Sequence, residues 1–198
     1  SFAPPAWRPS VMNLPLTVAA TLVILVLGLA PSETAREIVR KPWVAGRFVY
    51  ANQIIGRDVP ALEVKSELPV LSKNGFLATH PFIPENLRKP ENKWERLEAG
   101  RLISIAACSS CHSLTDTGIR PIAKYFPAEA DAAGINDWLS AGLYRGHIVY
   151  MPPLPLPELD RSVMSEFLAE IISVQKTDPQ RAANYAVKGF PKDSVGGK

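Results

Sequence analysis

Both cysteines of this 198-residue chain lie in one pentapeptide, Cys108-Ser109-Ser110-Cys111-His112. Cysteines so close in sequence cannot brace a domain, so a disulfide-stabilised secreted scaffold is excluded. The composition, with 46% hydrophobic and 21% charged residues, indicates one or two small folded domains rather than a disordered chain. The net charge is only +3, which argues against a nucleic-acid partner.

The spacing C-x-x-C-H is the attachment signature of c-type haem. Two thiols one helical turn apart can add across the two vinyl groups at one edge of a porphyrin, and the next side chain then points its imidazole at the iron. We therefore expect one covalent haem c, with Cys108 and Cys111 as its thioethers and His112 as the proximal iron ligand. A structural zinc site would need a second ligand pair, and only the scattered His80 and His147 remain for it. A thioredoxin-type pair would need a βαβ context, which the sequence lacks.

The second axial ligand must come from downstream of the motif. Met151 lies in the proline-rich run 150–157, which is expected to form a rigid extended loop that can hold a thioether against a haem face. Met164, in contrast, falls on the apolar stripe of a predicted helix and is expected to fill the core. We predict Met151 as the distal ligand, with His147 as the alternative and an open position as a third interpretation.

Helical periodicity surrounds the motif. A first helix is predicted over 94–107 and leads directly into Cys108. Asn136 is expected to cap a second helix, and Pro157 to open a third over 158–174.

Gly100 on the first of these helices would let the last one approach closely, with Phe167 lying over it. This layout, with the haem motif and the proline-flanked methionine, resembles the class I cytochrome c fold over residues 94–176. The resemblance implies a crossing of the first and last helices, a haem with one exposed edge, and Met151 as the distal ligand. Ser104 departs from the family pattern, which usually has an aromatic residue four positions after this glycine. The predicted fold is all-α.

An uncharged run of twenty residues extends over 11–30, after a short N-terminal arm of residues 1–10. A helix of this length spans about 30 Å, the thickness of a bilayer core. We therefore expect one transmembrane helix in contact with the lipid bilayer. Proline directly after Ala30 argues against a cleaved signal peptide. Because covalent haem c is matured on the outer side of the bacterial inner membrane, the haem domain is expected on the periplasmic side.

Residues 31–93 contain seven of the 19 prolines and no long apolar period. They are expected to form an extended, irregular segment, either a surface linker or a docking strap on a membrane partner. Residues 35–43 look like the end of the last membrane helix in subunit I of cytochrome bd-type quinol oxidases. Residues 74–78 and 151–154 are similar to the c-type cytochrome tail fused to some bd-like subunits. No quinol or oxygen chemistry follows, because the other membrane helices of such subunits are not in this chain.

These features predict an electron-transfer subunit with no catalytic residues of its own. It would relay single electrons between integral membrane redox subunits, bd-oxidase-like by the resemblance, and a soluble cytochrome or other carrier. Two alternatives stay open: a haem enzyme or gas sensor with a labile sixth ligand, and a structural assembly subunit. The C-terminal residues 177–198 are expected to form an exposed tail.

Overall fold

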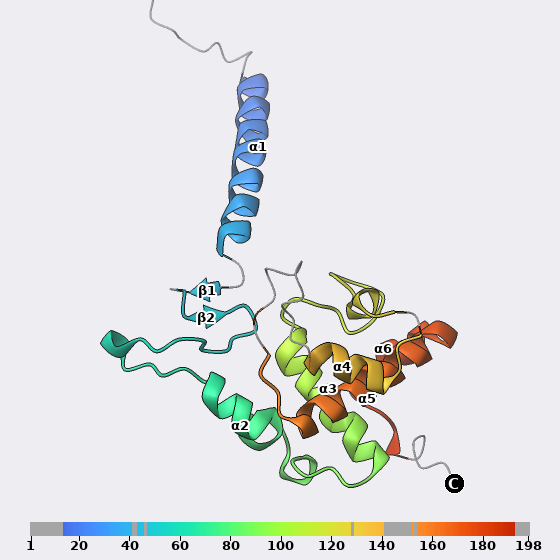
Figure 1. Ribbon diagram of the computed structural model, residues 1–198. Coiled ribbons are helices and arrows are strands. Elements are labelled where there is room, and N and C mark those ends of the chain that lie inside the picture. The colour runs from blue at the N-terminus through green and yellow to red at the C-terminus, as the bar shows by residue number, and fades with distance from the viewer. Residues whose placement is uncertain are drawn as a thin grey trace, which may run out of the picture. The chain divides into compact units, whose positions relative to one another are not determined.

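The computed structural model describes residues 14–40, 43–45, 47–127, 129–140, 152 and 154–192. These residues form six α-helices and one pair of short antiparallel strands, so the described chain is mostly helical, as predicted (Figure 1). The chain divides into two compact units, residues 1–41 and residues 42–198, and each is described by itself.

The helix of the first unit is α1, Leu14–Arg40, which contains Pro31. In its uncharged part the hydroxyl of Thr21 donates to the carbonyl of Thr17 (2.8 Å), and the hydroxyl of Ser32 donates to the carbonyl of Leu29 (2.9 Å). The large apolar side chains of this part are exposed; they are Leu14, Leu16, Val18, Leu22, Val23, Ile24, Leu25, Val26, Leu27 and Leu29.

The predicted transmembrane helix over 11–30 is not found in that form. Within the residues that the structure describes, no helix combines the length and the apolar character that crossing a membrane requires. Residues 11–13 of the predicted span lie outside the described residues, and past Pro31 the helix continues through the charged stretch that ends at Arg40.

The core of the second unit is the crossing of two helices, α3 (Lys93–Cys108) and α5 (Glu158–Thr177). They meet at Gly100, where a Cβ atom would lie 2.7 Å from the carbonyl carbon of Val163 and 2.8 Å from the Cβ of Phe167. Both helices and this close approach were predicted from the sequence. An unpredicted capping box starts α3: Asn92 accepts from the amide of Glu95 (2.9 Å), and the carboxylate of Glu95 accepts from the amide of Asn92.

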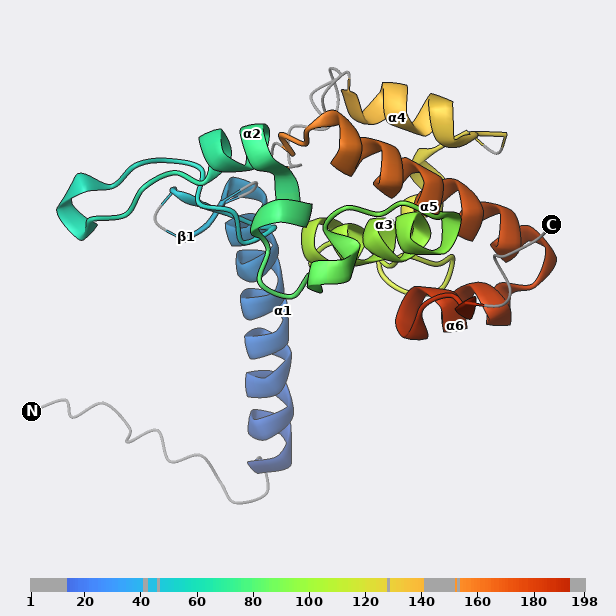
Figure 2. The ribbon, with the colours of Figure 1, turned by 90° about the horizontal axis from the view of Figure 1, so that it is seen from below.

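The helix α4, Ala132–Ser140, lies on one side of α5, and α6, Pro179–Lys188, lies on the other (Figure 2). The prediction that Asn136 caps α4 is wrong, since the helix begins four residues earlier. Asp131 precedes it and accepts the amide hydrogen of Gly134 at 2.8 Å, as an N-terminal cap does.

The prediction that residues 177–198 form an exposed tail is wrong for α6 and for Phe190, which lies two residues beyond the end of this helix. Ala182 and Ala186 of α6 are buried, and Phe190 packs edge-on against Phe167 of α5 (ring centroids 6.1 Å apart). The indole of Trp94 also donates to the carbonyl of Phe190 at 2.7 Å. The polar composition of this stretch concealed a helix whose small residues form its buried face.

The segment before α3 holds the strands β1 (Trp43–Ala45) and β2 (Val49–Tyr50) and the helix α2 (Leu68–Thr79). The strands β1 and β2 are paired antiparallel, and the ring of Trp43 stacks on the ring of Tyr50. The part from α2 onward adds apolar side chains to the core of the second unit; the buried ones are Leu71, Phe76, Leu77, Ile83 and Leu87. This part of the predicted strap therefore packs on the chain itself, while docking on a partner stays a prediction.

Candidate functional site

The cysteine motif lies at the C-terminal end of α3, whose last residue is Cys108. The chain then turns tightly, because the amides of Cys111 and His112 both donate to the carbonyl of Cys108, at 3.1 Å and 2.9 Å. The two cysteines are not bonded to each other, and both are partly exposed. Two free thiols one turn apart beside a histidine are the arrangement that the sequence predicts.

The imidazole of His112 is held by the loop that follows it. This residue is 9% exposed, and its Nδ1 lies 2.9 Å from the carbonyl oxygen of Arg120. A carbonyl only accepts hydrogen bonds, so in the neutral imidazole Nδ1 carries the proton and Nε2 keeps its lone pair. The ring of Tyr125 stands edge-on to the imidazole, with ring centroids 5.1 Å apart. The geometry therefore leaves Nε2 as the atom that can coordinate a metal.

The loop that supplies this carbonyl is closed by its own backbone. The amide of Ser113 donates to Ile119 (2.8 Å), and the amide of Ile122 donates back to Ser113 (2.9 Å). Gly118 and Arg120 both have positive φ, at 110° and 47°. The sequence predicts a loop over 120–122 after the motif. The hydrogen bond from His112 could not be predicted, because the positions of carbonyl groups depend on backbone angles that side-chain patterns do not specify.

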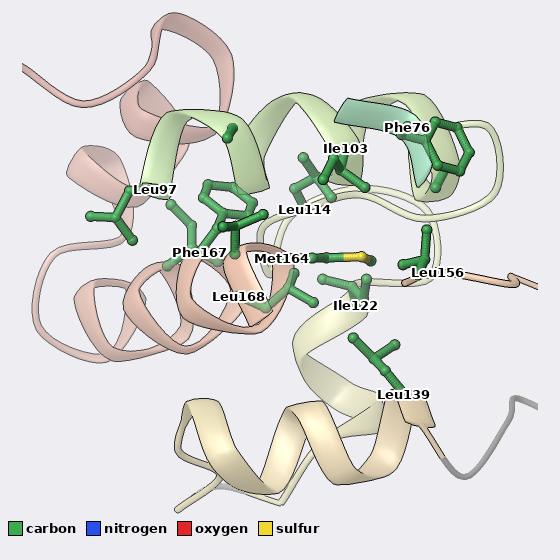
Figure 3. Close-up of a cluster of buried hydrophobic side chains, with 14 of the residues drawn as sticks. Phe76, Leu97, Ile103, Leu114, Ile122, Leu139, Leu156, Met164, Phe167 and Leu168 are labelled. Atoms are coloured by element: carbon green, nitrogen blue, oxygen red, sulfur yellow. The ribbon is translucent and has the colours of Figure 1, made fainter. Parts of the chain in front are cut away.

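Apolar side chains surround the motif. Figure 3 shows Met164 between Leu114 and Ile122, with its sulfur pointing toward Leu156. Met164 is 1% exposed, so it fills the core as predicted. Leu114 and Ile122 lie near the two ends of the loop that holds His112, and both belong to the buried apolar cluster to which α5 contributes Met164.

Burial raises the pKa of the Cys108 thiol to about 12, and the neighbouring Cys111 adds to the effect. Reactive redox cysteines in C-x-x-C motifs have lowered pKa values, because only the thiolate is nucleophilic. The raised pKa of Cys108 therefore disfavours the thioredoxin-type interpretation. Among the described residues, no group of three or more His, Cys, Asp or Glu side chains could hold a metal ion.

The predicted distal ligand, Met151, and its alternative, His147, lie outside the described residues. The choice between them stays a prediction. Two neighbours downstream, Pro152 and Leu156, are buried.

His80, the other histidine outside the motif, ends up beside aromatic rings. It follows α2 and lies 5.7 Å from the ring of Phe76 and 5.6 Å from that of Phe82, centroid to centroid. Burial lowers its pKa, and the charge of Glu67 acts in the opposite direction. This environment is that of a loop histidine.

Two thiols held one turn apart and an imidazole oriented through Nδ1, so that Nε2 keeps its lone pair, are the groups that could hold a covalently attached haem. No protein-family model, curated protein or solved structure matches this chain.

Proposed function

We propose that this protein carries one haem c, bound through Cys108 and Cys111, and transfers single electrons. The observation that carries the proposal is the hydrogen bond between Nδ1 of His112 and the carbonyl of Arg120. In a free histidine either ring nitrogen can hold the proton, whereas this contact commits the ring to Nε2 as the ligand atom. The C-x-x-C-H spacing supplies the two attachment points.

A bound haem would supply reversible one-electron chemistry, and the chain's residues would supply attachment and environment. The carbonyl of Arg120 keeps the imidazole in one orientation and increases the basicity of Nε2, which is the usual role of an outer hydrogen bond to a ligating histidine. Leu114, Ile122 and Met164 are buried apolar side chains that would keep water away from the core side of the haem site. The crossing of α3 and α5 at Gly100 supports the class I cytochrome c fold as the framework of this site.

The cellular setting belongs to the same proposal. Covalent haem c is attached outside the bacterial inner membrane, so the haem domain would lie in the periplasm. The exposed apolar side chains of α1 would associate with the lipid bilayer or with integral membrane redox subunits, for which a bd-like complex is the candidate. The electron partner on the other side would be a soluble cytochrome or a similar carrier.

Haem attachment can be tested with the two cysteines. When the full chain is produced in a bacterium that matures c-type cytochromes, we expect the wild type to keep its haem on a denaturing gel. The double variant Cys108→Ala/Cys111→Ala should lose it, because no thioether can form. Ser109→Ala is the matched control, since it changes the same turn and keeps both thiols. A wild type that is made in full without haem would contradict the proposal.

The distal ligand separates electron transfer from the enzyme and gas-sensor alternatives. If Met151 ligates the iron, Met151→Ala should lower the reduction potential or give a high-spin spectrum, whereas His147→Ala should change neither. Carbon monoxide should bind to the reduced Met151→Ala variant far faster than to the wild type, because the variant leaves one axial position open. Rapid binding to the wild type would favour the enzyme or sensor function.

A further inference from the structure

A buried acid lies in the first turn of α5. Asp160 is 1% exposed and is the only acidic residue buried to this degree among the described residues. Its Oδ2 accepts the backbone amides of Phe76 (2.5 Å) and Leu77 (3.3 Å), which are more than eighty positions away in the sequence. Asp160 therefore joins α2 to α5.

The backbone around Gly75 lies directly against this carboxylate. Gly75 interrupts α2 with φ 75° and ψ 177°, a region that essentially only glycine occupies. A Cβ atom on Gly75 would lie 2.5 Å from Oδ1 and 2.6 Å from Cγ of Asp160. The two amides that follow the glycine thus face the carboxylate directly, and no side chain separates them.

No cation is paired with this carboxylate in the described part of the chain. On α5, Arg161 pairs with Glu158, and on the neighbouring α3 Arg101 pairs with Glu98. Among the other ionisable groups of the elements packed around it, Arg88 pairs with Glu85 and donates to the carbonyls of Leu77 (3.1 Å) and Ala78, and Arg96 pairs with Glu166. Lys73 is exposed, and His80 lies between two aromatic rings.

Burial raises the pKa of Asp160 above its ordinary value, while the amides of Leu77 and Phe76 act to lower it. The amides can also donate to the carbonyl oxygen of a protonated acid, so Asp160 can gain or lose a proton and keep these hydrogen bonds. Asp160 therefore has the features of a group that titrates inside the core.

The position of Asp160 connects it to the candidate site. One helical turn, about 5.4 Å along α5, separates it from Met164, whose side chain lies between Leu114 and Ile122 (Figure 3). Those two residues flank the loop that holds His112. Since a protein interior screens charge less than water does, a negative charge at Asp160 would disfavour loss of positive charge at a group bound at His112.

We propose that Asp160 takes up a proton when the proposed haem site is reduced and releases it on oxidation. This inference rests on the proposed function. One electron comes from the donor protein and one proton from solvent; the carboxylate becomes a carboxylic acid, and no bond to the iron changes. Reduction removes one positive charge from the site, so it favours the neutral acid. By reciprocity, the reduction potential falls as the pH rises through the range in which Asp160 titrates.

Redox titration of the full-length haem protein, from the ordinary pKa of an aspartate upward over the pH range in which the chain stays folded, tests this. We expect the potential of the wild type to fall as the pH rises, and Asp160→Asn to have a clearly smaller slope and a higher potential where Asp160 is ionised. The matched control is Glu170→Gln, a partly exposed acid on the same helix, which should keep the wild-type slope. Equal slopes in the wild type and Asp160→Asn, with intact haem spectra, would overturn the inference alone.

A second measurement needs no variant. The reduced-minus-oxidised infrared spectrum of the wild type, recorded with and without 13C-labelled aspartate, should show an isotope-sensitive carboxylic-acid C=O band that appears on reduction. Absence of that band overturns the inference even if Asp160→Asn does not fold. A wild type without a haem spectrum overturns the proposed function, and this inference with it.

Discussion

Two contacts onto α5 differ in how they are built. The contact with α3 is a crossing of two periodic helices, where apolar side chains surround Gly100 and backbone touches backbone. The contact with α2 depends on one buried carboxylate, Asp160, that accepts two amides from an interrupted helix. The contact with α3 has no room for an added side-chain atom at Gly100, and the contact with α2 needs a hydrogen-bond acceptor at position 160. The same helix therefore uses shape on one side and hydrogen bonding on the other.

The largest effect is expected at the crossing. In Gly100→Ala the new Cβ meets the backbone of Val163, which cannot move aside as a flexible side chain could. We expect the free energy of unfolding to fall by about 3 kcal/mol or more, measured by urea denaturation. Gly134→Ala on α4 is the control, since its only close neighbour is the side chain of Asp131, and it should stay within about 1 kcal/mol of the wild type. Equal stability of the two variants would contradict a close crossing.

The contact with α2 should respond to chemistry more than to volume. Asp160→Ala leaves the buried amides of Phe76 and Leu77 without an acceptor, at about 1 to 3 kcal/mol for an unsatisfied group. We therefore expect a loss of about 2 kcal/mol in the same denaturation experiment. Asp160→Asn keeps an acceptor oxygen and should lose less. Equal destabilisation by both substitutions would show that the hydrogen bonds to the amides do not account for the stability of this contact.

The pH dependence of stability is a further test of this contact. The pKa of Asp160 is higher in the folded chain than in the unfolded one, so the folded state binds this proton more tightly. Its contribution to stability is fully present below the unfolded value, about 3.9, and is lost as the pH rises through the folded value. The stability of the wild type relative to Asp160→Asn should therefore decrease over this interval. An increase would show that ionisation strengthens the contact.

These contacts also mark what the sequence could and could not predict. Period and residue size were enough to place α3 and α5 and to identify Gly100 as the point of approach under Phe167. The partner of Asp160 could not be found, because a single aspartate in a helix carries no signal for amides eighty positions away. The buried face of α6 was missed because alanine at helical spacing is a weak apolar signal.

The smallest effect is expected at Ser104, where the class I cytochrome c pattern that the sequence resembles usually has an aromatic residue. Ser104 is fully buried in α3, and its hydroxyl has no hydrogen-bond partner within the described ranges. Ser104→Ala removes an unsatisfied polar group from the apolar face, so it should stabilise the chain by up to about 1 kcal/mol. Thermal unfolding of Ser104→Ala beside Ser165→Ala, whose hydroxyl donates to Arg161 at 2.7 Å, provides the comparison. Destabilisation by Ser104→Ala would indicate that its hydroxyl has a partner after all.

The most direct test of the central claim is the intact mass of the wild-type chain, together with its reduced absorption spectrum, after production with the c-type maturation apparatus. Two thiols one turn apart and an oriented His112 predict a mass increase of one haem that survives denaturation, and a low-spin c-type spectrum. A folded chain with the mass of the polypeptide alone and no haem absorption would contradict it.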